Sequence, residues 1–223
     1  ARADGRATEP EFSLTKWHTD RGLPDNSVTS VLPARDGYIW LAGDSGLARF
    51  DGVRFRRPDP GPDTDVATAR MRLLHEDQQG RLWTALYYGQ LAYFQQGKFH
   101  QPAQPAETRR TVTSFCSDEN GDLLVGWNTG QVSAFRAGRL EPVAGFQATG
   151  GTIQLCADRA DKRVWFRQSG QWGWRDGTNS VSLNSDARGP ALLLAARAGG
   201  VWALSGNQLW RVTDAAEPVV VAA

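Results

Sequence analysis

The stretch Gly22–Phe55, which reads GLPDNSVTSVLPARDGYIWLAGDSGLARFDGVRF, decides the fold of this chain. Four short apolar segments, VTSVL, YIWLAG, LARF and VRF, are separated by the turn sequences ARDG, DSG and DG. β-Branched and aromatic residues favour strands, and Asp-Gly supplies the positive φ angles that a tight hairpin needs. The stretch therefore predicts four consecutive antiparallel strands.

The same pattern returns along the chain at a spacing of about 40 residues. Similar strand–turn–strand segments begin at Met71, Val112, Thr152 and Leu192. Three landmarks recur together in each unit: a bulky residue in the second strand, a glycine before the third strand, and an aromatic residue at its end. The bulky residues are Trp40, Trp83, Leu124, Trp165 and Trp202, the glycines are Gly46, Gly89, Gly130, Gly170 and Gly206, and the aromatic residues are Phe50, Phe94, Phe135, Trp174 and Trp210.

A period of about 40 residues with four strands in each unit is typical of β-propeller blades. The sequence therefore predicts an all-β fold, a β-propeller built of four-stranded antiparallel blades. We expect the landmark tryptophans and phenylalanines to act as wedges, because large rings fill the space between twisted sheets. After a polar N-terminal tail at residues 1–11, the β-propeller should cover residues 12–223, with blades at about 22–60, 66–104, 110–148, 150–186 and 190–222.

A further strand-like segment, FSLTKW at Phe12–Trp17, precedes the first unit. Residues 12–21 therefore read as an orphan outer strand, of the kind that many propellers pair into the last blade. All five units already carry a fourth strand of their own. We expect the chain to be part of a larger propeller, seven-bladed or double, whose open blade edges associate with another copy. A closed five-bladed ring is the alternative.

Composition excludes several classes of function. The net charge of +1 gives no attraction to nucleic acid or to an anionic membrane. No run of 18 apolar residues occurs, so we expect no membrane contact by this chain. Gly-rich phosphate loops and the motifs HExxH, GxSxG and the EF-hand loop are missing from the sequence. We therefore expect no cofactor.

One histidine and both cysteines recur at a single position of the repeat, which raises the possibility of a metal site. His75, Cys116 and Cys156 occupy the same repeat position on first strands, where Leu32 and Leu194 stand in the other units. A His/Cys/Cys set can bind zinc. The leucines mark the position as a packing site, however, and each side chain should face the next sheet. We therefore predict no metal site, and two buried thiols with a core histidine.

The turns between second and third strands depart from the repeat on one face. DSG in the first unit becomes LYYG in the second and WNTG in the third. We predict a ligand-binding surface at Tyr87, Tyr88, Trp127 and Asn128, with Trp172 as a weaker candidate, because exposed aromatic rings stack on sugars or grip a peptide. The alternative is that these rings cover gaps between blades. No catalytic residues are predicted, because no acid recurs in the first strands.

The stretch that opens this section resembles the two-component regulator propeller repeat. Those repeats read roughly G-L-P-x-N-x-V, then D-x-x-G-x-[LI]-W-[IL]-G-T, then G-L-x-R-[FY]-D-G. The match weakens from the first unit to the fifth. The residues that fit are Gly22, Leu23, Pro24, Asn26, Val28, Asp36, Gly37, Trp40, Gly43, Gly46, Leu47, Arg49, Phe50, Asp51 and Gly52.

The resemblance implies the periplasmic sensing region of a bacterial membrane sensor, such as a hybrid two-component histidine kinase or a diguanylate cyclase. Members of the family are thought to sense polysaccharide breakdown products. We therefore expect a non-catalytic propeller, in the extracytoplasmic part of an inner-membrane protein, that binds an unknown small molecule or oligosaccharide. The alternatives are a propeller lyase or glycosidase, and a protein-interaction propeller.

Overall fold

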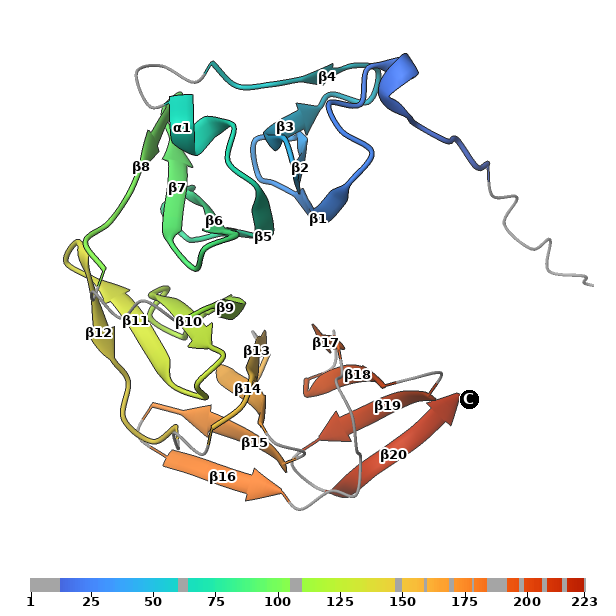
Figure 1. Ribbon diagram of the computed structural model, residues 1–223. Coiled ribbons are helices and arrows are strands. Elements are labelled where there is room, and N and C mark those ends of the chain that lie inside the picture. The colour runs from blue at the N-terminus through green and yellow to red at the C-terminus, as the bar shows by residue number, and fades with distance from the viewer. Residues whose placement is uncertain are drawn as a thin grey trace, which may run out of the picture.

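A computed structural model shows five four-stranded antiparallel sheets arranged as a β-propeller (Figure 1). This confirms the predicted fold class. The structure describes residues 13–59, 64–104, 110–146, 150–158, 160–168, 171–177, 179–183, 192–196, 199–205, 208–213 and 216–222. Within these ranges the helical elements are a 3-10 turn, η1 (Thr19–Arg21), and one short helix, α1 (Thr64–Ala67). Neither could span a membrane.

Each sheet takes its strands from one continuous stretch of chain. Blade 1 consists of β1 (Val28–Pro33), β2 (Ile39–Gly43), β3 (Gly46–Phe50) and β4 (Phe55–Arg56), blade 2 of β5 (Met71–Glu76), β6 (Leu82–Leu86), β7 (Leu91–Gln95) and β8 (Lys98–His100), and blade 3 of β9 (Val112–Ser117), β10 (Leu123–Trp127), β11 (Val132–Arg136) and β12 (Arg139–Pro142). Blade 4 consists of β13 (Ile153–Asp158), β14 (Arg163–Gln168), β15 (Gln171–Asp176) and β16 (Asn179–Leu183), and blade 5 of β17 (Leu192–Ala195), β18 (Val201–Ser205), β19 (Gln208–Thr213) and β20 (Ala216–Ala222).

The blades follow one another around an arc, with blades 1 and 5 at its two ends (Figure 1). The first strand of each blade faces the centre and the fourth strand lies at the rim. Consecutive first strands contact one another, β1 with β5, β5 with β9, β9 with β13, and β13 with β17. The ends of these first strands therefore surround one central space.

The landmark aromatic residues lie between consecutive blades. The ring of Trp40 in blade 1 is 5.5 Å from that of Phe94 in blade 2, and the ring of Trp83 in blade 2 is 4.7 Å from that of Phe135 in blade 3. Trp165 is buried in a cluster with residues of blade 5, against which Trp174 and Trp210 pack. Blades 1, 2 and 4 thus each direct a second-strand tryptophan toward the next blade, whereas Leu124 of blade 3 packs in a cluster with Phe166 of blade 4.

The landmark glycines allow a close approach between consecutive blades. The segment that enters each next blade passes directly over the glycine of the blade before it. Gly46, Gly89 and Gly130 have φ angles of +93°, +85° and +83°, which favour glycine. A Cβ atom at Gly46 would lie 2.0 Å from the Ala67 carbonyl oxygen, and one at Gly89 would lie 1.9 Å from that of Arg110. The corresponding Gly170 and Gly206 lie outside the described residues.

The prediction of an orphan outer strand before blade 1 is wrong for the described part of that segment. Residues 13–18 form no strand, and Phe12 lies outside the described residues. A strand needs a partner edge, and each of the five sheets is completed to four strands by residues 28–222. Trp17 instead packs against blade 1, with ring centroids 5.1 Å from Phe50 and 5.4 Å from Phe55.

Candidate functional site

Two of the predicted ligand-binding residues are exposed at a turn. Tyr87 and Tyr88 follow β6 with exposed fractions of 46% and 88%, and their rings meet edge to face at 5.5 Å. The Arg70 guanidinium lies 4.5 Å from the centre of the Tyr87 ring and forms an ion pair with Asp44 at 2.6 Å. The Tyr87 amide also donates to the Arg70 carbonyl oxygen at 2.9 Å. Tyr87 is therefore held by Arg70, and the tyrosine pair is a solvent-facing aromatic surface.

The prediction that Trp127 lies exposed at the neighbouring turn is wrong. Trp127 ends β10, its exposed fraction is 3%, and its indole N–H donates to the Ser133 hydroxyl at 3.0 Å. The strand continues through this residue, so its ring turns into the cluster between blades 2 and 3. Asn128 ties the turn to the entry of β9, because its side-chain oxygen accepts from the Thr111 amide at 2.9 Å.

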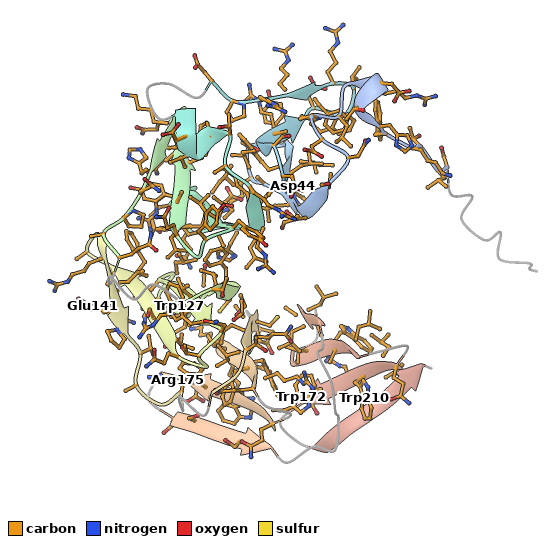
Figure 2. All side chains as sticks on the ribbon, viewed as in Figure 1. Asp44, Trp127, Glu141, Trp172, Arg175 and Trp210 are labelled. Atoms are coloured by element: carbon orange, nitrogen blue, oxygen red, sulfur yellow. The ribbon has the colours of Figure 1, made fainter. Side chains whose placement is uncertain are left out.

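Trp172 is also buried, with an exposed fraction of 0%. It lies in β15 opposite Arg167 of β14 and belongs to the cluster between blades 4 and 5. Figure 2 shows Trp172 at the side of blade 5 that faces blade 4, and Trp127 within blade 3. The sequence placed Trp172 outside the repeat, whereas β15 begins one residue before it and turns the ring inward.

The structure also contains a central cavity of about 740 Å³. Residues from all five blades line it, at the inner ends of the first strands and in the turns that follow. It lies at the opposite end of β6 from the tyrosine pair. Its polar lining consists of Arg35, His75, Glu76, Gln78, Ser117, Asp118, Glu119, Asp158, Lys162 and Arg163.

Polar contacts between neighbouring blades surround this cavity. Arg35 of blade 1 reaches Glu76 of blade 2, with an ion-pair distance of 3.5 Å and a hydrogen bond of 2.9 Å from its backbone amide. The His75 Nε2 and the Ser117 hydroxyl join blades 2 and 3 at 2.9 Å. Asp158 of blade 4 accepts a hydrogen bond from the Gly200 amide of blade 5. A bound ligand would therefore touch groups that set the packing of neighbouring blades.

An acid at one repeat position was missed by the sequence analysis. Asp77, Asp118 and Asp158 each stand at or directly after the end of a first strand. Asp77 is buried and binds the Arg81 guanidinium at 2.5 Å and the Trp83 indole N–H at 2.7 Å. Asp118 and Asp158 line the cavity. The recurring aspartate can be seen in the sequence as the last residue of the segments HED, CSD and CAD. It was not predicted because only acids within the first strands were considered.

Burial changes the titration of Asp118. Desolvation raises the pKa of this carboxyl group, and it outweighs the hydrogen bonds from the Asp122 and Asn120 amides, which lower the pKa. The Arg136 guanidinium lies 3.6 Å away on the side of the exposed rim. The carboxyl group therefore holds its proton more readily than an exposed aspartate does.

The three residues weighed as a zinc set face three different blades. His75 bonds to blade 3, Cys116 packs in the cluster with Ile153 of blade 4, and Cys156 packs against the cluster that includes Leu193 of blade 5. In the described part of the chain, no group of three or more His, Cys, Asp or Glu side chains is placed to hold a metal ion.

We expect both thiols to resist alkylation in the folded protein. Burial raises the pKa of Cys116 well above its usual value, and burial together with Asp158 raises the pKa of Cys156 to about 12. Because the thiolate is the reacting species, only about one Cys156 thiol in ten thousand is ionised near pH 8.

Timed labelling with iodoacetamide, read by intact mass, should show no adduct in buffer and two adducts in denaturant. Fast labelling of the folded protein would contradict this placement of the thiols. Circular dichroism on the same samples confirms that the unlabelled protein is folded.

Comparison with known proteins gives a family match over part of blade 1 and many structural matches. Residues 22–45 match the model of the Two component regulator propeller family. No curated protein matches the chain. The family resemblance of the opening stretch is thus confirmed over these residues.

Solved structures similar to this chain come from proteins of several kinds. A virginiamycin B lyase from Staphylococcus aureus matches with a TM-score of 0.71 at 13% identity, over 88% of this chain and 70% of that chain. The extracellular domain of a hybrid two component system from B. thetaiotaomicron matches with a TM-score of 0.67 at 15% identity, over 88% of this chain and 31% of that chain. At such identities the likeness shows the fold alone.

Proposed function

We propose that this chain is a ligand-sensing propeller of a bacterial membrane-bound signal-transduction protein of the two-component sensor type. The family match of residues 22–45 supports this class. So does the likeness to extracellular domains of hybrid two component systems. These relatives also support a periplasmic location. The chain spans 31% of the matched sensor chain. That the propeller controls a signalling domain elsewhere in the whole protein is therefore also part of this proposal.

The observation that carries the proposal is the central cavity shared by all five blades. A ligand held there contacts Arg35 at one end of the arc and Leu193 at the other. It can therefore favour one arrangement of the blades over another. A sensor transmits a signal only when its ligand binds the two arrangements with different free energies. The contacts between blades at Arg35, His75 and Asp158 are the places where that difference would arise.

The lining of the cavity suits an oligosaccharide. Carboxylates, guanidinium groups and a hydroxyl group stand beside Phe115, and sugars present many hydroxyl groups next to apolar ring faces. Glu119 is exposed at the rim between blades 3 and 4 and lines the cavity. It is therefore free to accept hydrogen bonds from a sugar. The tyrosine pair on the opposite face is the competing site for the same class of ligand.

Calorimetric titration with cellotetraose, xylotetraose, maltotetraose and tetragalacturonic acid tests the proposal. We expect saturable binding of at least one of these sugars, which mass spectrometry then recovers unchanged. Glu119→Gln should weaken that binding about tenfold, because a hydrogen bond to a charged group contributes about 1.5 kcal/mol.

Tyr88→Ala is the matched variant on the other face and should leave the affinity unchanged. Loss of affinity in Tyr88→Ala with normal binding in Glu119→Gln would place the ligand on the tyrosine pair. Absence of binding to every sugar tested would count against an oligosaccharide ligand.

An enzymatic function is the second candidate. His75 lies within hydrogen-bond distance of Ser117 and lines the cavity with Glu76 and Asp118, and such groups can transfer protons. One of the structural relatives is a catalytically inactive variant of virginiamycin B lyase. Conversion of a bound sugar to products, abolished by His75→Ala, would support this candidate over the sensor.

A further inference from the structure

A smaller cavity, of about 230 Å³, lies between blades 3 and 4. We name it the side pocket, and its lining includes Glu119, Leu124, Phe146, Val164 and Arg175. Figure 2 shows Arg175 on the side of blade 4 that faces blade 3. Pockets for drug-sized ligands begin at about 300 Å³. The side pocket therefore suits a small molecule rather than an oligosaccharide.

The side pocket lies where blade 3 departs from the repeat. The landmark position of the second strand holds tryptophan in the other four blades and Leu124 in blade 3. In blade 2 the ring at this position, Trp83, reaches Phe135 of the next blade and donates to Asp77 at 2.7 Å. Leucine is smaller and has no N–H group. It therefore leaves a space between blades 3 and 4, and Asp118, which corresponds to Asp77, lines that space.

The floor of the side pocket is apolar. Leu124 and Val164 are buried, each with an exposed fraction of 3%. The Phe146 ring packs edge to face against Phe166 at 5.4 Å. A ligand in the pocket must place an apolar group on this floor, because a polar group there would lose its hydrogen bonds to water.

Two opposite charges line the pocket beside this floor. The Arg175 guanidinium lies 5.5 Å from the centre of the Phe146 ring, and it donates to the Gly177 carbonyl oxygen at 2.7 Å and to that of Ala144. A Cβ atom at Gly177 would lie 4.0 Å from the Glu119 Oε1, so the glutamate reaches the same turn. Neither charged side chain forms an ion pair with another described residue. Each is thus available to a group of opposite charge on a ligand.

We propose that the side pocket binds a free α-amino acid with an apolar side chain. Arg175 donates hydrogen bonds to the carboxylate group, Glu119 accepts from the ammonium group, and the side chain lies on the apolar floor. A zwitterion satisfies both charges at once, whereas a simple acid or amine satisfies one. The site is independent of the proposed sensing function, because Leu124 and Arg175 do not line the central cavity.

Calorimetric titration of the full chain with L-leucine tests this inference, and we expect saturable binding. Leucinamide lacks the carboxylate group, and 4-methylpentanoic acid lacks the ammonium group. Each should bind about tenfold more weakly than leucine, because each leaves one charge of the pocket without a partner. Binding of either analogue as tight as that of leucine would overturn the assignment of a zwitterion.

Two variants test the placement of the ligand in the side pocket. Leu124→Trp puts the residue of the other blades into the space, so we expect a folded protein by circular dichroism that no longer binds leucine. Arg175→Gln should weaken leucine binding about tenfold. Arg139→Gln is the matched control, because Arg139 is exposed on blade 3, pairs with Glu141 at 2.8 Å and does not line the pocket. It should leave the affinity unchanged.

Absence of leucine binding to the unaltered chain would overturn the inference. So would unchanged affinity in Leu124→Trp or in Arg175→Gln, or a loss in Arg139→Gln as large as that in Arg175→Gln. The sugar titration has a separate outcome, because neither Leu124 nor Arg175 lines the central cavity. Failure of leucine to bind would therefore leave the sensing proposal standing, and failure of every sugar to bind would leave this one standing.

Discussion

Replacement of Gly89 with alanine is expected to lower the free energy of unfolding by about 4 kcal/mol. Gly89 has a φ of +85°, and a Cβ atom there would lie 1.9 Å from the Arg110 carbonyl oxygen. The added methyl group would force apart the turn of blade 2 and the strand entry of blade 3. Both are backbone, so neither can move aside as a flexible side chain does.

Gly97→Ala is the matched control for this prediction. Gly97 has a similar φ of +79°, but no atom lies within 4 Å of an added Cβ. Gly97→Ala should lower the free energy of unfolding by only ~1–2 kcal/mol, which is the cost of placing an alanine in the left-handed conformation. Urea unfolding followed by circular dichroism measures both variants. Equal losses in the two would show that the close approach between blades contributes nothing.

Trp83→Ala is expected to lower the free energy of unfolding by about 4 kcal/mol. The Trp83 ring is fully buried, contacts Tyr93 and Phe135 at 4.7 Å each, and donates to Asp77 at 2.7 Å. Its removal opens a large cavity between blades 2 and 3 and removes one partner from a buried carboxylate.

Trp202→Ala is the internal comparison, because it changes the same repeat position in blade 5, where the ring is only half-buried. We expect a loss of about 1 kcal/mol there. Thermal unfolding of both variants at the same protein concentration checks the difference. A Trp202→Ala variant as unstable as Trp83→Ala would show that the complete burial of Trp83 adds nothing to its contribution.

The fold could be predicted from the sequence because its units repeat locally. Each blade is a run of short hairpins, so Asp-Gly turns and the landmark residues at Trp40, Gly46 and Phe50 report the fold without any long-range information. The N-terminal segment could not be predicted in this way. Whether FSLTKW forms a strand depends on a partner edge, and its strand-like composition says nothing about that edge.

The candidate site was predicted only in part, for a similar reason. Tyr88 is exposed because its turn departs from the repeat and points away from the sheets. Trp127 departs from the repeat equally, but it still belongs to β10 and turns into the blade interface. The central cavity draws single residues from all five blades. Only the curvature of the arc brings Arg35, Glu119 and Asp158 around one space.

Hydrogen exchange with and without the sugar that binds best in the calorimetric panel tests the central claim most directly. The account predicts slower exchange at the inner ends of first strands in several blades at once, around residues 75–78, 115–119 and 155–158, with the sugar recovered unchanged. Slower exchange confined to the turn at residues 86–90, or cleavage of the sugar, would contradict a sensing ligand held in the central cavity.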